Sequence, residues 1–380
     1  MNLKIERRQI PVLLLTGYLG SGKTTLLNRI LTNRKGIRFA VIVNDLGEVN
    51  IDAGLIEKGG VVGQTDTSLV ALQNGCICCT LKMDLVEQIR GLLAMRKFDY
   101  IVIEASGICE PAPIAQTVST MPALAGLGLA DDIPYVDSIV TIVDSLRMKD
   151  EFAGGDALGR PDIGEDDLER LVIEQIEFCN IVLLNKASEI STEELGKLKA
   201  IVKGLNPGAK VLTCDYGDID LDEIIYTGMF DFDAVATSAA WIAAIEGEDE
   251  EEEAEGEALE YGIDTYVYYR RGPLDLNKFD YFAAKAWPEN IIRAKGLCYF
   301  DGDIDKCYLF EQAGRQKTLR DAGLWYATME RTELDRMMER DATLRRDWDP
   351  VYGDRMQKIV FIGQNLDKDA IARLMDACLA

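Results

Sequence analysis

The sequence predicts an α/β protein in two parts: a doubly wound, mostly parallel sheet, followed by a second, smaller α+β domain. Three observations predict this fold class. The chain has 380 residues, which is more than one hydrophobic core usually holds. Its first 240 residues alternate short apolar runs with helical patterns. An acidic segment then changes the composition before a new set of runs begins.

The strands of the first part are predicted from six runs rich in Val, Ile and Leu. Each run is apolar throughout, as a strand buried on both faces of a parallel sheet should be. The runs are residues 12–17, 39–44, 100–105, 138–144, 180–186 and 210–214. Helical patterns lie between them, for example at 24–36 and 84–97. This order predicts repeated strand–helix units.

An acidic segment separates the two parts. Residues 246–260 hold ten acidic residues and no basic ones, so they repel one another and favour a solvated linker. A weak cation-collecting tract is the alternative. We expect a P-loop domain at 1–240, an acidic linker at 241–261 and a C-terminal domain at 262–380. In the C-terminal domain, strands are predicted at 265–269, 292–300, 307–314 and 357–366, and helices at 279–286, 332–347 and 367–380.

The composition argues against several classes of partner. The formal net charge of −24 disfavours binding to nucleic acid or to an anionic membrane surface. No apolar run reaches the roughly 20 residues that span a bilayer. The N-terminal apolar run leads into a glycine-rich turn, which indicates a buried strand and not a signal peptide. We expect a cytoplasmic protein whose nine cysteines form no disulfide framework.

A phosphate-binding loop is predicted at residues 17–24, GYLGSGKT, which match G-x-x-x-x-G-K-[ST] between a predicted strand and a predicted helix. In such a loop, backbone N–H groups turn toward phosphate oxygens and the helix N-terminus adds its positive end. Lys23 is expected to neutralise the β- and γ-phosphates, and the Thr24 hydroxyl to ligate Mg²⁺. The nucleotide-binding residues predicted here are Gly17, Gly20, Ser21, Gly22, Lys23, Thr24 and Thr25.

A second acidic element is predicted in YIVIEASG, residues 100–107. Glu104 stands at the end of the predicted strand, where its carboxylate can orient Mg²⁺ or the attacking water. The amide of Gly107 can meet the γ-phosphate.

A base-reading element is predicted in LLNKAS, residues 183–188, which resembles the guanine-reading N-K-x-D of GTPases. Asn185 would meet the base edge, and the stem of Lys186 would cover the ring. Ser188 stands where the Asp is normally found. A hydroxyl cannot replace a bidentate carboxylate, so discrimination between guanine and adenine should weaken.

A metal site is predicted in NGCICCTL, residues 74–81, which holds three cysteines within four positions of a chain without histidine. Thiolates are strong ligands for Zn²⁺ and Co²⁺, which points to Cys76, Cys78 and Cys79. Neighbouring residues of an extended stretch face opposite sides, so a local turn must bring the three sulfurs together. The fourth ligand would be Asp, Glu, water or a guest molecule. Buried, structural or redox-active thiols are the alternative.

In this order, the motifs resemble the CobW-type P-loop GTPases, a family of metal-handling proteins. The resemblance covers nearly the whole chain and rests on GYLGSGKTTLLNRIL, VIVNDLGEVNID, NGCICCTL, IEASGICEP, LLNK, RAKG and GDRMQKIVFIG. It implies a nucleotide domain and then a CobW-type C-terminal domain with a ferredoxin-like core. It also implies GTP hydrolysis coupled to delivery of a transition metal, commonly Zn²⁺ or Co²⁺.

The sequence departs from the family at Asp45, where the family usually has a Glu that is implicated in the metal site. The resemblance makes Asp45 the candidate fourth ligand of the metal and, with Glu104, a candidate for placing the attacking water. Aspartate is one methylene shorter than glutamate, so water is an alternative ligand. Acidic residues replace the histidine-rich tract that many relatives carry between their domains.

The leading hypothesis is a GTPase metallochaperone that binds metal through the C-x-C-C thiolates and delivers it to a client metalloenzyme or cofactor-assembly protein. Hydrolysis would depend on Lys23, Asp45 and Glu104. The alternative is a nucleotide-gated adaptor that activates a client, for example a corrinoid-dependent enzyme, without metal transfer. An ATPase is a third hypothesis, because Ser188 replaces the Asp that normally selects guanine. A homodimer is compatible with each.

Overall fold

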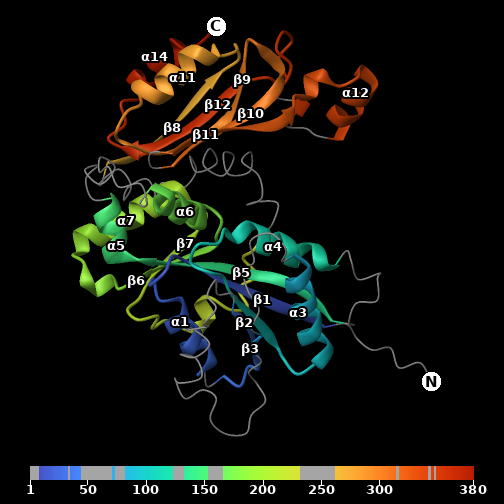
Figure 1. The fold of residues 1–380 in the computed structure, drawn as a ribbon, viewed down its shortest axis with the longest axis vertical. Helices are drawn as coiled ribbons and strands as arrows, with labels where there is room; N and C mark the ends of the chain where they lie inside the picture. Colours follow the sequence, from blue (N-terminus) through green and yellow to red (C-terminus); the bar gives the residue numbers. More distant parts are fainter. Residues whose placement is uncertain are drawn as a thin grey trace. The chain divides into compact units, whose positions relative to one another are not determined.

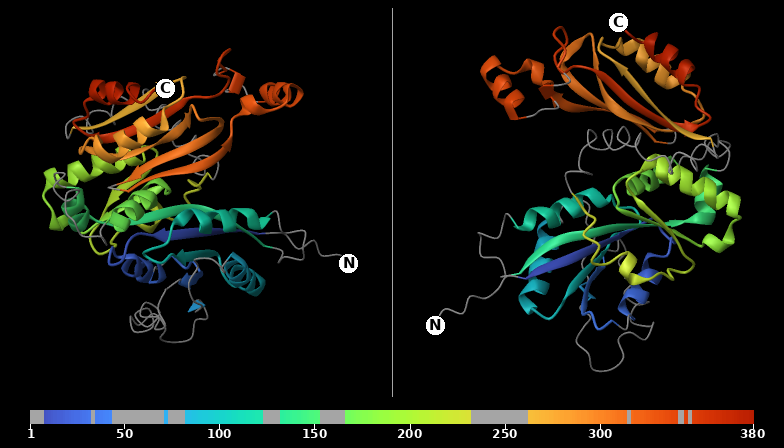
Figure 2. Two further views of the ribbon diagram at one scale, coloured as in Figure 1. Left: turned by 45° about the horizontal axis from the view of Figure 1, so that its top comes forward. Right: turned by 180° about the vertical axis from the view of Figure 1, so that it is seen from behind.

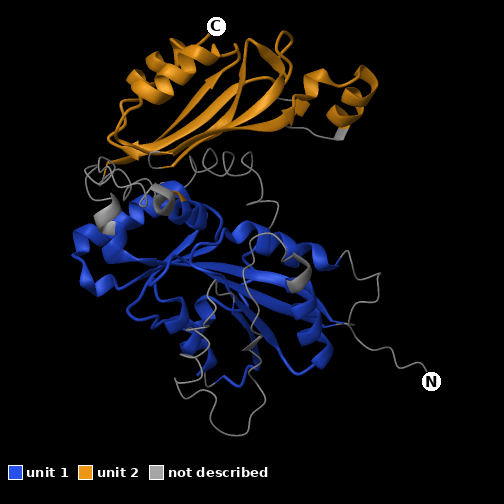
Figure 3. Ribbon diagram, in the orientation of Figure 1, with its two compact units in different colours: residues 1–151, 171–240 blue, residues 152–170, 241–380 orange. Residues whose placement is uncertain are grey.

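The computed structural model describes residues 8–32, 35–43, 71–72, 82–122, 132–152, 166–231, 262–313, 316–340, 344–345 and 348–380. The chain divides into two compact units, one of residues 1–151 and 171–240 and the other of residues 152–170 and 241–380 (Figure 3). Among the described helices, none is both long and apolar enough to cross a lipid bilayer.

The first unit is built on a seven-stranded parallel sheet in the order β3-β2-β4-β1-β5-β6-β7 (Figure 1). Every neighbouring pair in it is parallel, which confirms the predicted doubly wound sheet. Its strands are β1 (Gln9–Thr16), β2 (Phe39–Val43), β3 (Ala71–Leu72), β4 (Tyr100–Glu104), β5 (Ile133–Asp144), β6 (Ile181–Asn185) and β7 (Lys210–Thr213). All residues of β2, β4 and β6 are buried, as runs that are apolar on both faces require.

Helices cover both faces of this sheet, with α1 on one side and α4 on the other (Figures 1 and 2). The helices are α1 (Lys23–Leu31), α3 (Lys82–Met95), α4 (Pro111–Thr120), α5 (Ser145–Phe152), α6 (Asp166–Glu177) and α7 (Thr192–Leu205). Two short 3₁₀ turns follow β6 and β7, at Ala187–Glu189 and Leu221–Glu223. The start of α7 is fixed by a capping box between Ser191 and Glu194.

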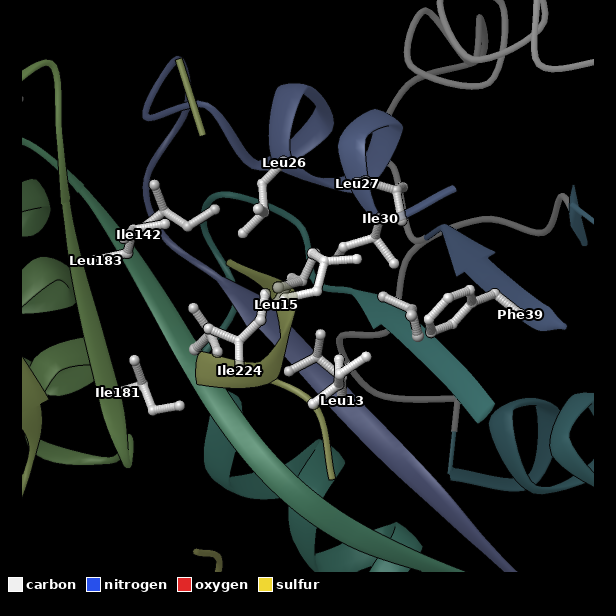
Figure 4. Packing of buried hydrophobic residues seen from close by; sticks show 14 of the residues in the cluster. Leu13, Leu15, Leu26, Leu27, Ile30, Phe39, Ile142, Ile181, Leu183 and Ile224 are labelled. Carbon is white, nitrogen blue, oxygen red and sulfur yellow. The ribbon is translucent and has the colours of Figure 1, made fainter. Parts of the chain in front are cut away.

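The core beneath α1 sets the position of the phosphate-binding loop. Leu26 and Ile30 on the inner face of α1 pack with Leu13 and Leu15 of β1 (Figure 4). All four side chains are fully buried. A shift of the helix along the sheet would open a cavity in this core. A cavity the size of one large side chain costs about 2–5 kcal/mol. Its N-terminus is held at the carboxyl end of β1.

The second unit contains a five-stranded antiparallel sheet in the order β11-β10-β9-β12-β8. β8 and β9 both run antiparallel to β12, so they are parallel to each other and are joined by α11 with β12 between them. This split β-α-β arrangement belongs to the predicted α+β class. The elements are β8 (Ile263–Arg270), α11 (Leu276–Lys285), β9 (Ile291–Phe300), β10 (Asp303–Ala313), β11 (Gln316–Leu324), α12 (Arg331–Arg340), β12 (Gln357–Gln364) and α14 (Lys368–Asp376).

One strand of the second unit, β11, was not predicted. Its sequence, QKTLRDAGL, is polar and lacks the apolar alternation of a half-buried strand. β11 lies at the edge of the sheet, and most of its residues are exposed. It forms because its backbone pairs with that of β10 in an antiparallel ladder. Backbone pairing places no requirement on the side chains of β11, so its sequence does not reveal the strand.

A buried carboxylate just before β5 forms ion pairs with two arginines. The side chain of Asp132 is fully buried and accepts from Arg8 Nη2 at 2.6 Å and Arg96 Nη2 at 3.0 Å. Burial alone would raise the pKa of this carboxyl, but the hydrogen bonds from Arg8 and Arg96 outweigh it and hold the pKa at about 2. Because that value lies below the unfolded one, the carboxylate stabilises the fold above about pH 4, and this contribution is lost as the pH falls toward 2.

We expect Asp132→Asn to lower the free energy of unfolding by about 1–3 kcal/mol at pH 7, because both arginines lose an anionic partner. The difference from the parent chain should shrink between pH 4 and pH 2. Urea unfolding followed by far-UV circular dichroism measures both effects. Asp99→Asn is the matched control, since Asp99 pairs with Arg38 at a more exposed site and should cost less than about 1 kcal/mol. An equal deficit for Asp132→Asn at pH 7 and below pH 3 would contradict the assignment.

Candidate nucleotide-binding site

The phosphate-binding loop occupies the turn from β1 into α1. Gly22, the residue before α1, has φ +111°, a left-handed conformation that favours glycine. A Cβ atom there would lie 2.4 Å from Asn185 Nδ2. Glycine is therefore required at this position for two reasons: the backbone is left-handed, and the side chain of Asn185, at the end of β6, leaves no room for a Cβ atom.

Lys23 points back into the loop that precedes it. Its side chain is 8% exposed, and its ammonium donates to the carbonyl oxygens of Gly17 at 2.7 Å and Tyr18 at 3.2 Å. This position places a buried positive charge inside the loop, as phosphate binding requires. Of the other predicted loop residues, Ser21 is buried, Gly20 has a left-handed φ of 80°, and Thr25 is exposed on the first turn of α1.

Thr24 and Glu104 are brought together by the pairing of β1 with β4, in which Leu15 is the register partner of Glu104. The Thr24 hydroxyl donates to Glu104 Oε1 at 3.1 Å, and Glu104 is 2% exposed. A hydroxyl beside a buried carboxylate supplies two hard oxygen atoms, the ligand type that Mg²⁺ prefers. These residues therefore fit a Mg²⁺ ion at the β4 end of the phosphate-binding loop.

The turn after β4 is pressed against the phosphate-binding loop at Gly107. A Cβ atom on Gly107 would lie 2.7 Å from the backbone nitrogen of Leu19. Gln175 of α6, which is fully buried, holds this turn by donating from Nε2 to the carbonyl oxygens of Gly107 at 3.5 Å and Cys109 at 3.2 Å. The sequence gives no signal for this role of Gln175, because it depends on a contact 66 residues away along the chain.

Asn185 at the end of β6 connects three loops. Its Nδ2 donates to the carbonyl oxygen of Ser21 at 2.8 Å, and its Oδ1 accepts from the backbone N–H of Gly217 at 3.2 Å. The next residue, Lys186, has a left-handed φ of 58°, and its ammonium pairs with Asp144 at the end of β5. An acidic residue that closes a buried strand was the available signal for Asp144, which the sequence analysis missed.

Ser188 donates hydrogen bonds to a carboxylate in the loop that follows β7. Its backbone N–H and its hydroxyl both donate to Asp215 Oδ1, each at 3.0 Å. Asp215 follows β7, 27 residues farther along the chain, and was not among the predicted site residues.

Comparison with known proteins identifies the family. A family model described as the CobW/HypB/UreG nucleotide-binding domain matches residues 11–213. A second model, described as the cobalamin synthesis protein cobW C-terminal domain, matches residues 263–379. The chain belongs to the CobW family of P-loop GTPases.

Relatives of this CobW-family chain cover most of its length. A protein of Dictyostelium discoideum named zinc-regulated GTPase metalloprotein activator 1 is 33% identical over 98% of this chain and 80% of its own length. The zinc chaperone YjiA of Escherichia coli is 27% identical over 95% of this chain and 96% of its own. The crystal structure of Zn(II)-bound YjiA GTPase covers 98% of this chain and 100% of its own, with 21% identity and a TM-score of 0.43.

The predicted metal ligands of this CobW-family chain, Cys76, Cys78, Cys79 and Asp45, lie outside the described residues. The six cysteines inside the described ranges are all buried. Burial raises the thiol pKa of Cys179 and Cys307 to about 12 and that of Cys214 to about 11. These thiols stay protonated near neutral pH and are poor metal ligands. The described ranges also contain no cluster of three or more Cys, Asp or Glu suited to a metal ion.

We expect Gly107→Ala to weaken GTP binding by about tenfold or more, because the new methyl group collides with the backbone of Leu19 and must displace the phosphate-binding loop. Titration with a fluorescent GTP analogue measures the change. Gly91→Ala is the control: a Cβ at Gly91, within α3, meets open space, and alanine is the better helix former. Unchanged GTP affinity in Gly107→Ala would show that the contact between the two loops is not needed for binding.

We expect Glu104→Gln to raise the Mg²⁺ concentration needed for half-maximal GTP hydrolysis by about tenfold, because an amide oxygen is a weaker ligand than a carboxylate. GTP affinity measured in EDTA should change little. Glu87→Gln, on the exposed side of α3, is the matched control and should behave like the parent chain. An unaltered Mg²⁺ requirement in Glu104→Gln would remove Glu104 from the metal site.

Proposed function

We propose that the chain is a GTP-hydrolysing metallochaperone that carries zinc to a client protein. The observation that carries the proposal is the 33% identity, over 98% of this chain, to a protein named zinc-regulated GTPase metalloprotein activator 1. This similarity extends through both units, and two further relatives are named zinc chaperones. These names favour Zn²⁺ over Co²⁺ as the carried ion. The client in this proposal is a metalloenzyme or a cofactor-assembly protein.

Five residues take part in the hydrolysis in this proposal. The buried ammonium of Lys23 binds the β- and γ-phosphates. Thr24 and Glu104 would hold Mg²⁺, which would supply positive charge to neutralise the charge that develops on the phosphates. The amide of Gly107 faces the γ-phosphate from the opposite loop. Asp45 or Glu104 places the attacking water.

The C-x-C-C segment is the proposed zinc site, and the sheet topology supports it. β3 pairs in parallel with β2, so it ends at the same edge of the sheet as β1 and β4. Only three strand spacings, about 14 Å, separate β3 from β1. Cys76 follows Leu72, the last residue of β3, by four residues, a reach of at most about 14 Å.

The same edge supports coupling between the nucleotide and the metal. Val43, the last residue of β2, is the register partner of Glu104, and Asp45 follows it by two residues. A segment that leaves the sheet at Val43 therefore starts beside Glu104, at the same edge as the phosphate-binding loop. Hydrolysis then changes metal affinity if GTP and GDP favour different arrangements of this segment. By linkage, zinc must alter GTP affinity by the same factor.

We expect Zn²⁺ affinity to differ at least about tenfold between the complex with a non-hydrolysable GTP analogue and the complex with GDP. Substitution of Cys76, Cys78 and Cys79 together by serine should weaken Zn²⁺ binding about 100-fold or more, since it removes three thiolate ligands. Competition with a chromogenic chelator measures both. Cys378→Ser is the matched control: this buried thiol donates to the carbonyl oxygen of Leu374 at 3.3 Å, a bond that a hydroxyl can keep.

Two outcomes would contradict the proposal. No measurable Zn²⁺ or Co²⁺ affinity in the parent chain would favour a nucleotide-gated adaptor that transfers no metal. Equal Zn²⁺ affinity with GTP analogue, GDP and no nucleotide would remove the coupling on which delivery depends.

A further inference from the structure

We propose that Asp215, in the loop after β7, reads the guanine edge of the nucleotide in place of the carboxylate that Ser188 lacks. Ser188 is the third residue after Asn185, the position at which a GTPase base-reading element normally carries Asp. The carboxylate of Asp215 lies one hydrogen bond from both the backbone and the side chain of Ser188, at 3.0 Å each. The missing chemical group is therefore present at the site, on a neighbouring loop.

The loop that carries Asp215 is fastened to the base-reading loop by backbone groups as well. The backbone N–H of Ala187 donates to the carbonyl oxygen of Cys214 at 3.2 Å, and that of Gly217 donates to Asn185 Oδ1 at 3.2 Å. Asn185 in turn donates to Ser21 of the phosphate-binding loop at 2.8 Å. Asp215 is thus held in the same network that positions the phosphates.

The carboxylate of Asp215 has acceptor capacity left for a ligand. Both bonds from Ser188 fall on Oδ1, and within the described part of the chain no residue donates to Oδ2. The side chain is partly exposed, so a ligand can reach it. The Ser188 hydroxyl can rotate away, which returns a lone pair to Oδ1, while the Ser188 backbone N–H keeps the carboxylate in place.

The other acidic side chains near this loop have different partners. Asp218 pairs with Arg29 at 2.7 Å, and Asp220 and Asp222 both pair with Lys35. Asp144 pairs with Lys186. Asp215 is the carboxylate that this loop directs at Ser188.

The two carboxylate oxygens match guanine and reject adenine. Guanine presents two adjacent donors, N1–H and the N2 amino group, which a carboxylate can accept together. Adenine presents an acceptor at N1, which a carboxylate repels. We therefore expect a preference for GTP over ATP, which reverses the expectation drawn from Ser188 alone.

The test exchanges the carboxylate for an amide and changes the base to match. Asp215→Asn should weaken binding of a fluorescent GTP analogue by about 10- to 100-fold, because it removes hydrogen bonds to a charged acceptor. The same variant should gain affinity for the xanthosine triphosphate analogue, because the new amide N–H can donate to the carbonyl group that replaces the guanine amino group. Asp215→Ala should lose GTP affinity without gaining xanthosine triphosphate.

Two further variants separate base reading from a change in folding. Asp222→Asn makes the same chemical change at an exposed carboxylate and should leave the nucleotide preference unaltered. Adding Ser188→Asp to Asp215→Ala should restore GTP preference, because it returns a carboxylate to the site.

The titrations use the full chain in zinc-free buffer, so their outcome is independent of metal delivery. Two results would overturn the inference. One is equal binding of GTP and ATP analogues by the parent chain. The other is an Asp215→Asn variant with parental GTP affinity and no gain for xanthosine triphosphate.

Discussion

The parallel pairing of β1 with its two neighbours is the constraint on which the nucleotide site depends. β1 lies between β4 and β5, so the loop that leaves it meets the loops that leave both. The register between Leu15 and Glu104 places a carboxylate beside the first turn of α1. Because the carboxyl ends of all these strands share one edge, residues far apart in the chain come together there, where open α/β sheets bind their ligands.

The strands and the phosphate-binding loop could be predicted because their signals are local. Apolar runs such as 39–44 and 100–105 correspond to buried strands, and the spacing of GYLGSGKT fixes the loop and the helix start. Gln175 and Asp215 could not be predicted, because the partner of each lies far along the chain and only the fold brings the two together. Asp144 carried a local signal, since it closes a buried strand. Asp45 and the three clustered cysteines stay predictions.

The cysteines of this chain divide into three clustered at residues 76–79 and six that are spread along the sequence. Those in the described ranges are all buried, so they act as small hydrophobic residues. The segment at 74–81 has a different composition, with polar and glycine neighbours around Cys76. The predicted metal site therefore uses none of the thiols that pack the cores of the described residues.

The charged residues of the edge strand β11 have two consequences. Its charged residues, among them Lys317, Arg320 and Asp321, are what made it unrecognisable as a strand. An unpaired strand edge with an apolar face offers a template on which another chain can add, and charge along that edge discourages aggregation. The charges that make β11 hard to predict as a strand therefore also disfavour self-association through this edge of the sheet at high concentration.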